Sequence, residues 1–312
     1  MGSKEKKASR TSTGIFLIMT IPVLIYFIFE AYLPMFGALL AFKQFHFARG
    51  GFFASFWSSP WVGFQNFKFL FTTDAALVMF RNTILYNLVF IITVTVCSVA
   101  LAVCINELLN KKMAKIYQTM MFFPYFLTTI VVSYFVFSFF SMDMGSVNGI
   151  LTHLHIHTPV NWYAKPVAWP FIIIIVNLWK GIGYTSILYL ATIVGIDSQY
   201  YEAAVMDGAS KWQQIKFITI PHLRPIITLM VIMALSGILK SDFGMFYVIP
   251  QNAGALLPTT QTIDTYQYRG LVTLGSIGMP AAAGLFQSFV GLILILTVNK
   301  VVKKFDSDSA MF

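Results

Sequence analysis

The stretch Gly195–Pro221 reads GIDSQYYEAAVMDGASKWQQIKFITIP and lies between two long apolar segments. It is too polar to cross a membrane, yet its helix signals are too regular for a slack loop. Asp197 or Ser198 can cap a short helix over about Gln199–Met206, because their side-chain oxygens accept the first free backbone N–H groups. Gly208 then provides the backbone freedom for a turn that most residues resist.

A second short helix is expected after this turn. Ser210 and Gln213 have the spacing of a capping box, which predicts a helix start at Ser210. We expect Pro221 to end that helix, because the residue before a proline is pushed out of helical geometry. The stretch therefore predicts two short helices joined by a tight turn.

The first of these helices carries Glu202, Ala203 and Ala204 in a row. Two small side chains allow a helix to sit deep in a groove of another protein, and Glu202 beside them adds one anionic contact. This combination is typical of a docking element rather than of a catalytic centre.

The rest of the chain is rich in apolar residues. Of its 312 residues, 57% are hydrophobic and 11% are charged, and the mean hydropathy is +0.74. A typical soluble domain has roughly 25% charged residues. Six membrane spans of about 23 residues would use roughly 140 residues, which leaves only short connections and no room for a built-in ATPase or ligand-binding domain. We therefore expect an all-α membrane protein.

Six apolar segments are long enough to cross a bilayer. They form one expected transmembrane domain over residues 14–305, between a tail of residues 1–13 and a tail of residues 306–312. Residues 195–222 connect the fourth and fifth spans. The expected spans cover residues 14–36, 79–109, 116–140, 167–194, 223–248 and 279–302.

The distribution of positive charge indicates the orientation of these spans. If both termini lie in the cytoplasm, the inner connections hold 13 Lys and Arg residues and the outer connections hold five. Cytoplasmic connections of membrane proteins carry such an excess. The net charge of +9 therefore follows from topology, and we do not expect a nucleic-acid partner.

The docking element resembles a motif of permease subunits in binding-protein-dependent ABC importers. That motif is Glu-Ala-Ala, three residues, Gly, nine residues, then Ile-x-Leu-Pro. Here Glu202, Gly208, Ile218 and Pro221 lie in register, and Ile220 stands where leucine is usual. The swap between two apolar side chains of similar size should leave the packing almost intact.

The resemblance extends over roughly residues 15–305. It points to the carbohydrate-uptake class, and within it to permeases for polysaccharides and complex oligosaccharides. The stretches that carry this second likeness are Ala41–Phe45, Pro60–Phe67, Asn106–Lys112, Phe123–Phe126 and Ile263–Arg269.

The resemblance implies the type I importer permease fold with six transmembrane helices, and uptake of oligosaccharides across the bacterial cytoplasmic membrane. It implies a second, different permease, two ATPase subunits and an extracytoplasmic solute-binding protein as partners. This chain would be no enzyme and would bind no cofactor, since ATP and Mg would sit on the ATPase subunits. The residues expected to couple this chain to the ATPases are Glu202, Ala203, Ala204, Asp207 and Gly208.

The outer connections are the expected docking surface for the binding protein, in particular residues 37–78 and 250–278. The first of these is also rich in Phe and Trp. Such rings prefer the headgroup layer of a bilayer, so we expect this stretch to lie along the outer membrane interface.

Several polar side chains fall inside the expected spans. Lys180 lies near the middle of the fourth, where a charge costs about 2.5–3.5 kcal/mol, so it should face the bundle interior, a wet cavity or a packing partner. Tyrosine rings combine an apolar face with a hydrogen-bonding end, which suits a sugar ring. If lysines line the path, acidic sugars become the favoured substrates. The expected substrate path includes Lys180, Tyr184, Tyr189, Lys240, Asp242 and Gln287.

Other functions fit the sequence less well. Another polar solute, such as glycerol phosphate or an amino acid, is the alternative substrate. A secondary carrier working alone would show inverted repeats, which are not evident, and no nucleophile–base set indicates an intramembrane enzyme. The alternating His153, His155 and His157 could share one face of an extended segment, but only Asp143 lies near them, so we expect no metal site.

Overall fold

The computed structural model describes residues 16–155, 159–273 and 275–305, and these are almost entirely helical. The only β pairing among them is an isolated bridge between Lys43 and Trp61. The prediction of an all-α membrane protein is confirmed, since within these described residues five helices are long and apolar enough to span a membrane and a bent pair can supply a sixth span. The expected tails of residues 1–13 and 306–312, and His157, lie outside the described residues.

The chain divides into two compact units. The first consists of the residues up to 72 together with residues 267–285, and the second consists of residues 73–266 together with the residues from 286 onward. The first unit contains the apolar helix Phe16–Phe42, which includes a π turn, and a set of short helices. The apolar helix includes η1 (Ile28–Tyr32), α2 (Leu33–Met35) and η2 (Phe36–Phe42), and the short helices after it are α3 (Gly51–Ser58), η3 (Gly63–Phe67) and α4 (Phe69–Thr72).

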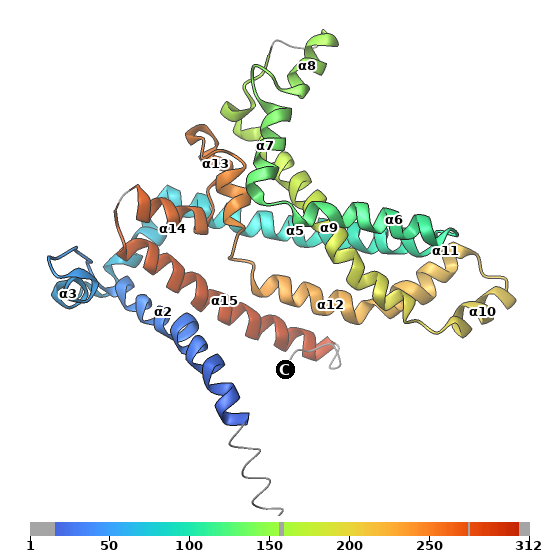
Figure 1. Ribbon diagram of the computed structural model, residues 1–312, viewed down its shortest axis with the longest axis horizontal. Coiled ribbons are helices and arrows are strands. Elements are labelled where there is room, and N and C mark those ends of the chain that lie inside the picture. The colour runs from blue at the N-terminus through green and yellow to red at the C-terminus, as the bar shows by residue number, and fades with distance from the viewer. Residues whose placement is uncertain (1–15, 156–158, 274, 306–312) are drawn as a thin grey trace, which may run out of the picture. The chain divides into compact units, whose positions relative to one another are not determined.

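Long helices that lie side by side build the second unit, in which α5 (Asp74–Asn106) packs along α9 (Trp169–Val194) (Figure 1). The Thr73 side chain accepts the Ala76 N–H and so caps the start of α5. At 1.5 Å per residue, α5 is about 50 Å long and exceeds the roughly 30 Å hydrocarbon layer. Further helices of this unit are α6 (Lys111–Phe122), α7 (Thr129–Phe140) and α12 (Ile220–Ser236).

Shorter elements connect these helices. They are η4 (Phe123–Phe126), α8 (Ser146–His153), η5 (Trp162–Ala164), η6 (Pro166–Ala168), α10 (Ser198–Met206), α11 (Lys211–Gln214), η7 (Ile215–Thr219), η8 (Gly244–Val248), η9 (Gly254–Leu256) and α13 (Leu257–Thr260). The chain then continues through α14 (Ile263–Val272) and α15 (Gly278–Phe305).

The third apolar segment is broken, whereas the sequence predicted one continuous span over residues 116–140. The helical stretches Lys111–Phe126 and Thr129–Phe140 meet at an angle of 99°. Pro124 lies in the 3-10 turn η4 and Leu127 is extended, because a proline within a helix removes a donor and clashes with the preceding turn. Thr128 then caps the new helix α7 by accepting the Val131 N–H.

The fifth segment is also interrupted, where the sequence predicted a helix through residue 248. Helix α12 ends at Ser236, and π turn η8 begins only at Gly244. Asn87 donates to the Ile238 and Lys240 carbonyls at 2.9 Å each, and Gln287 donates to the Leu239 carbonyl at 2.5 Å. An unpaired backbone group in hydrocarbon costs several kcal/mol, so these amides make the break tolerable.

A close helix contact positions the middle of α9. A Cβ atom at Gly183 would overlap the backbone of Met121 and Phe122, at the end of α6. Gly181, two residues earlier on the same helix, has open space around it. The close approach of α9 to α6 therefore requires a residue without a side chain at Gly183, but not at Gly181.

We predict that Gly183→Ala destabilises the protein by about 1–3 kcal/mol or more, because the added methyl group meets backbone that cannot rotate away. Gly181→Ala is the matched control, and it should leave stability unchanged or raise it slightly, because alanine is the better helix former. Thermal unfolding of both variants in detergent checks this. Equal melting temperatures for the two would contradict the described packing.

Candidate functional site

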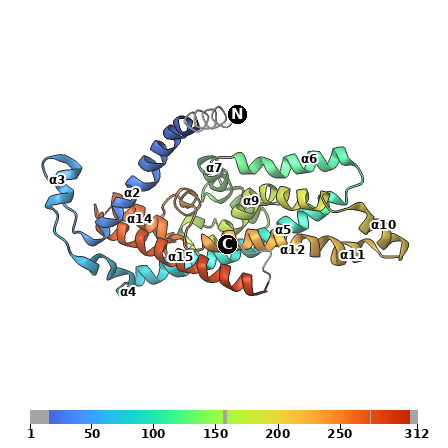
Figure 2. The same cartoon turned by 90° about the horizontal axis from the view of Figure 1, so that it is seen from below.

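The loop of residues 195–222 lies at one end of the bundle made by α5, α6, α9 and α12 (Figure 2). Its first helix, α10, begins after Asp197, whose carboxylate accepts the Gln199 N–H at 3.0 Å. The helix closes at Gly208, which has a φ of +76°. The Ala209 N–H then donates to the Ala204 carbonyl at 2.8 Å. The predicted cap, helix and glycine turn are present.

The second helix begins at the predicted capping box. The Ser210 hydroxyl accepts the Gln213 N–H, and the Gln213 side chain accepts the Ser210 N–H at 2.7 Å. The prediction that Pro221 ends this helix was wrong, since α11 continues through π turn η7 into α12. A π turn widens the helix just before Pro221, where the proline has no N–H to donate.

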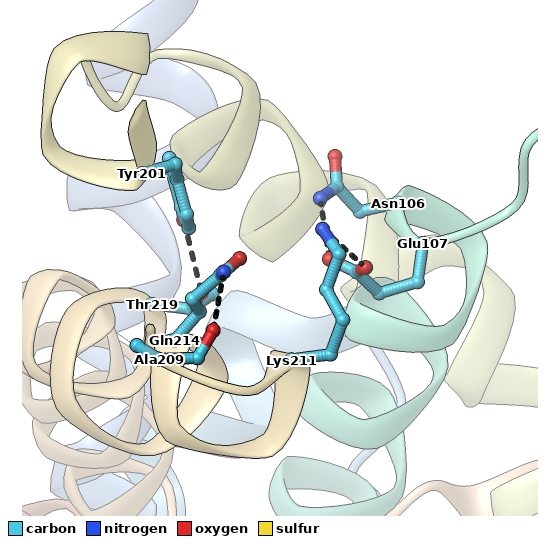
Figure 3. A network of polar contacts seen from close by, with 7 residues as sticks. All are labelled: Asn106, Glu107, Tyr201, Ala209, Lys211, Gln214 and Thr219. Carbon is cyan, nitrogen blue, oxygen red and sulfur yellow. Dashed lines mark hydrogen bonds and ion pairs between the residues drawn. The ribbon is translucent and has the colours of Figure 1, made fainter. Parts of the chain in front are cut away.

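Side-chain hydrogen bonds fix the two short helices against each other (Figure 3). The Tyr201 hydroxyl on α10 lies 2.9 Å from the Thr219 hydroxyl, and the Gln214 amide donates to the Ala209 carbonyl at 3.2 Å. Gln214 and Thr219 are both buried. These residues were not predicted from the sequence, although the polarity of Thr219 between Ile218 and Ile220 was a usable signal.

An ion pair connects this loop to the end of α5. The Lys211 ammonium lies 3.3 Å from the Glu107 carboxylate, and the Asn106 amide also donates to Glu107 at 3.5 Å (Figure 3). The Lys211 side chain is 73% exposed and the Glu107 side chain 31%. Such a pair contributes only about 0–1 kcal/mol, so it orients the loop on α5 rather than holding it there.

The outer surface of α10 has the properties of a protein-docking surface. Glu202 and Ala203 are exposed, and Met206 is 87% exposed. Beside them lies a shallow groove of about 480 Å³, and it is lined by Tyr201, Glu202, Val205, Met206, Lys211 and Gln214. A small-residue helix beside a groove with apolar edges and charges of both signs suits binding to another protein, and this surface offers no nucleophile–base arrangement.

The structure brings together part of the predicted substrate path. Lys180 and Tyr184 lie one helical turn apart on α9 and so share a face. The Lys180 ammonium donates to the Thr129 hydroxyl at 3.4 Å, at the bend before α7. The Tyr184 ring stacks on Tyr125, with centroids 4.4 Å apart and planes 8° from parallel, and both rings are partly exposed.

Tyr125 and Thr129 were not predicted for this surface. Both belong to the chain around the break at residues 127–128, and a sequence gives no direct indication of which helix such a break will face. The Pro124–Tyr125 pair inside an apolar run was the available signal, since proline in that position indicates a break.

The other predicted path residues make different contacts. Tyr189 is fully buried in an apolar cluster with Ala102, Ile193 and Leu223. Lys240 and Asp242 are exposed on the unwound segment before η8, where the Asp242 carboxylate accepts the Met245 N–H at 3.1 Å. Gln287 is buried and bonded to the backbone of that same segment.

Residues 94–306 match the family described as binding-protein-dependent transport system inner membrane component. This match covers the loop of residues 195–222, α9 and both helix breaks. The chain belongs to this family. It is therefore an integral membrane permease component of a binding-protein-dependent transport system.

Two proteins of Bacillus subtilis are similar to this chain over most of their length. Protein LplB of Bacillus subtilis (strain 168) is 31% identical, with 93% of this chain and 89% of that protein covered. The polygalacturonan/rhamnogalacturonan transport system permease protein YteP of the same strain is 28% identical, with 93% of this chain and 88% of that protein covered.

A solved structure has the same fold. It is a chain of the bacterial alginate ABC transporter in complex with an alginate pentasaccharide-bound periplasmic protein, with a TM-score of 0.84 and 28% sequence identity. The alignment covers 96% of this chain and 97% of that chain. The prediction of an ABC importer permease fold is thereby confirmed.

Proposed function

We propose that this permease takes up oligosaccharides, delivered by an extracytoplasmic solute-binding protein, and that it works with a second, different permease and two ATPase subunits. ATP and Mg bind to those ATPase subunits, and this chain binds no cofactor. Both termini and the loop of residues 195–222 face the cytoplasm of a bacterium, and the protein lies in the cytoplasmic membrane. The observation that carries the proposal is the face of α10 on which Glu202 and Ala203 are exposed, on a loop whose Lys211 pairs with Glu107 of the α5 end.

The coupling residues have separate tasks in this proposal. Glu202 supplies the charged contact to an ATPase subunit, and Ala203 and Ala204 allow close approach. Asp207 and Gly208 form the turn that sets the angle between α10 and α11. Motion of the ATPases then passes through α11 and η7 directly into α12, because no break in the helical backbone separates them.

We predict that Gly208→Val uncouples ATP hydrolysis from uptake, because a β-branched residue resists a φ of +76°. Gly208→Asn is the matched control, since asparagine tolerates this conformation and a Cβ atom there meets open space. Glu202→Lys should uncouple as well, through charge reversal at the contact. The measurement is the ratio of sugar transported to ATP hydrolysed in proteoliposomes of the assembled transporter.

Near-normal ratios in Gly208→Val and Glu202→Lys, with normal membrane insertion, would contradict the docking role of α10. Loss of coupling in Gly208→Asn as severe as in Gly208→Val would show that the backbone conformation is not the cause.

We further propose that the surface around Lys180 and Tyr184 contacts the sugar. The stacked rings of Tyr184 and Tyr125 offer an apolar face with hydroxyl ends. Lys240 and Asp242 contribute from the unwound segment of residues 237–243. Tyr189 and Gln287 support the path from behind, since one packs the helices and the other holds the unwound backbone.

The charge of Lys180 favours acidic oligosaccharides. Within the described part of the chain it has no salt-bridge partner, and its hydrogen bond to Thr129 is long. A sugar carboxylate would supply the missing opposite charge. The names of two similar proteins, for alginate and for polygalacturonan/rhamnogalacturonan, support the same substrate class.

We predict that Lys180→Gln weakens the response to uronate oligosaccharides about tenfold or more, the expected loss for a charge-assisted hydrogen bond of about 1.5–3 kcal/mol. Lys180→Arg, which keeps the charge, should retain most of the response. ATPase stimulation by binding protein loaded with acidic or neutral oligosaccharides checks this. An equal effect of Lys180→Gln on both sugar types would contradict the role of charge, and stimulation only by glycerol phosphate or an amino acid would replace the sugar proposal.

A further inference from the structure

The segment of residues 40–67, here called the aromatic loop, has polar side chains in its interior. Lys43, Ser55 and Ser59 are only 2%, 1% and 3% exposed. The Lys43 ammonium donates to the Phe56 carbonyl at 2.5 Å and to the Ser59 carbonyl at 3.3 Å. It also lies over the rings of Phe56 and Trp61, 4.4 and 4.9 Å from their centroids. A charged group therefore forms the centre of this loop.

The two buried serines accept hydrogen bonds inside the same loop. The Ser55 hydroxyl accepts the Ala48 N–H at 2.9 Å, and the Ser59 hydroxyl accepts the His46 N–H at 3.0 Å. The bridge between Lys43 and Trp61 closes the loop, with the Val62 N–H donating to the Phe42 carbonyl at 2.8 Å. The buried side chains of Lys43, Ser55 and Ser59 thus form hydrogen bonds with the backbone of the loop itself.

The outer surface of the aromatic loop is formed by large apolar rings. They come from α3, from η3 and from the chain between the helices. Those more than half exposed are Phe47 (80%), Phe52 (54%), Phe53 (77%), Trp57 (78%), Trp61 (63%) and Phe64 (75%). This is the reverse of a loop in water, where rings pack inward and polar groups remain outside.

The charged residues of this region indicate which medium surrounds the loop. No Asp or Glu occurs between Glu30 and Asp74, and Arg49 and Lys68 are exposed. Aromatic rings combined with cations and without acids fit the headgroup layer of a membrane with anionic lipids. The loop also follows directly from the apolar helix Phe16–Phe42, and α3 has only eight residues and is too short to cross a bilayer.

We propose that the aromatic loop is inserted into the membrane surface, with phospholipid around its outer rings and Lys43 sealed inside it. The loop then anchors the end of the first span. Since its outer rings are in lipid, it is not a docking surface for the binding protein, and of the two outer connections first considered only residues 250–278 keep that role. This inference uses the membrane location of the chain but not its substrate, so it can fail while the proposed transport function holds.

Depth-sensitive spin labelling of the assembled transporter in nanodiscs tests the proposal. In a background with Cys97 and Cys104 replaced by Ala, single labels are placed through Trp57→Cys and Phe53→Cys. The matched control is Met144→Cys, a residue that is 90% exposed on the turn after α7. The nanodiscs contain phosphatidylethanolamine with one quarter phosphatidylglycerol.

We expect labels at 57 and 53 to collide with dissolved oxygen several times more often than with a water-soluble nickel chelate, and the label at 144 to show the reverse. Strong collision with the nickel chelate at 57 and 53 would place the loop in water and overturn the proposal. Weak collision with both reagents would show that a protein covers these rings, which also overturns it. Two labelled positions guard against one variant that disturbs the loop.

Discussion

The structure depends on one constraint, namely that hydrocarbon offers no hydrogen-bond partner to the peptide backbone. Long uninterrupted helices meet this constraint by themselves. Where the fifth apolar segment unwinds, distant side chains meet it instead. Asn87 and Gln287 reach the carbonyls of residues 238–240, and the Asp264 carboxylate accepts the Ser241 N–H at 2.6 Å and its hydroxyl at 2.8 Å. The break is therefore a supported feature of the fold.

The break before α7 brings together the side chains that we propose to contact the sugar. The break before α7 places Thr129 against Lys180, and Tyr125 of the same region stacks on Tyr184. At the other end of the bundle, the loop of residues 195–222 joins α12 without interruption. Helices α9 and α12, which pack on each other, thus connect the surface around Lys180 with the loop of residues 195–222.

The sequence alone was sufficient for the parts of the fold that rest on local signals. Apolar length indicated the helices, and Asp197, Gly208 and Ser210 fixed the caps and turn of the docking loop. The unwinding after Ser236 could not be predicted, because its partners at 87 and 287 lie some 150 and 50 residues away in the chain. The buried charge of Lys43 was missed for the same reason, since its partners become neighbours only when the loop closes.

Co-purification is the direct test of whether this chain is one of two different permeases that work with an ATPase pair. The tagged full-length protein would be isolated in mild detergent, and every chain that accompanies it identified by mass spectrometry. We expect a second, different permease together with ATPase subunits at a ratio of two ATPases to each permease pair. Recovery of this chain alone, stable and without ATPase, would contradict this proposal and leave the exposed face of α10 without its proposed ATPase partner.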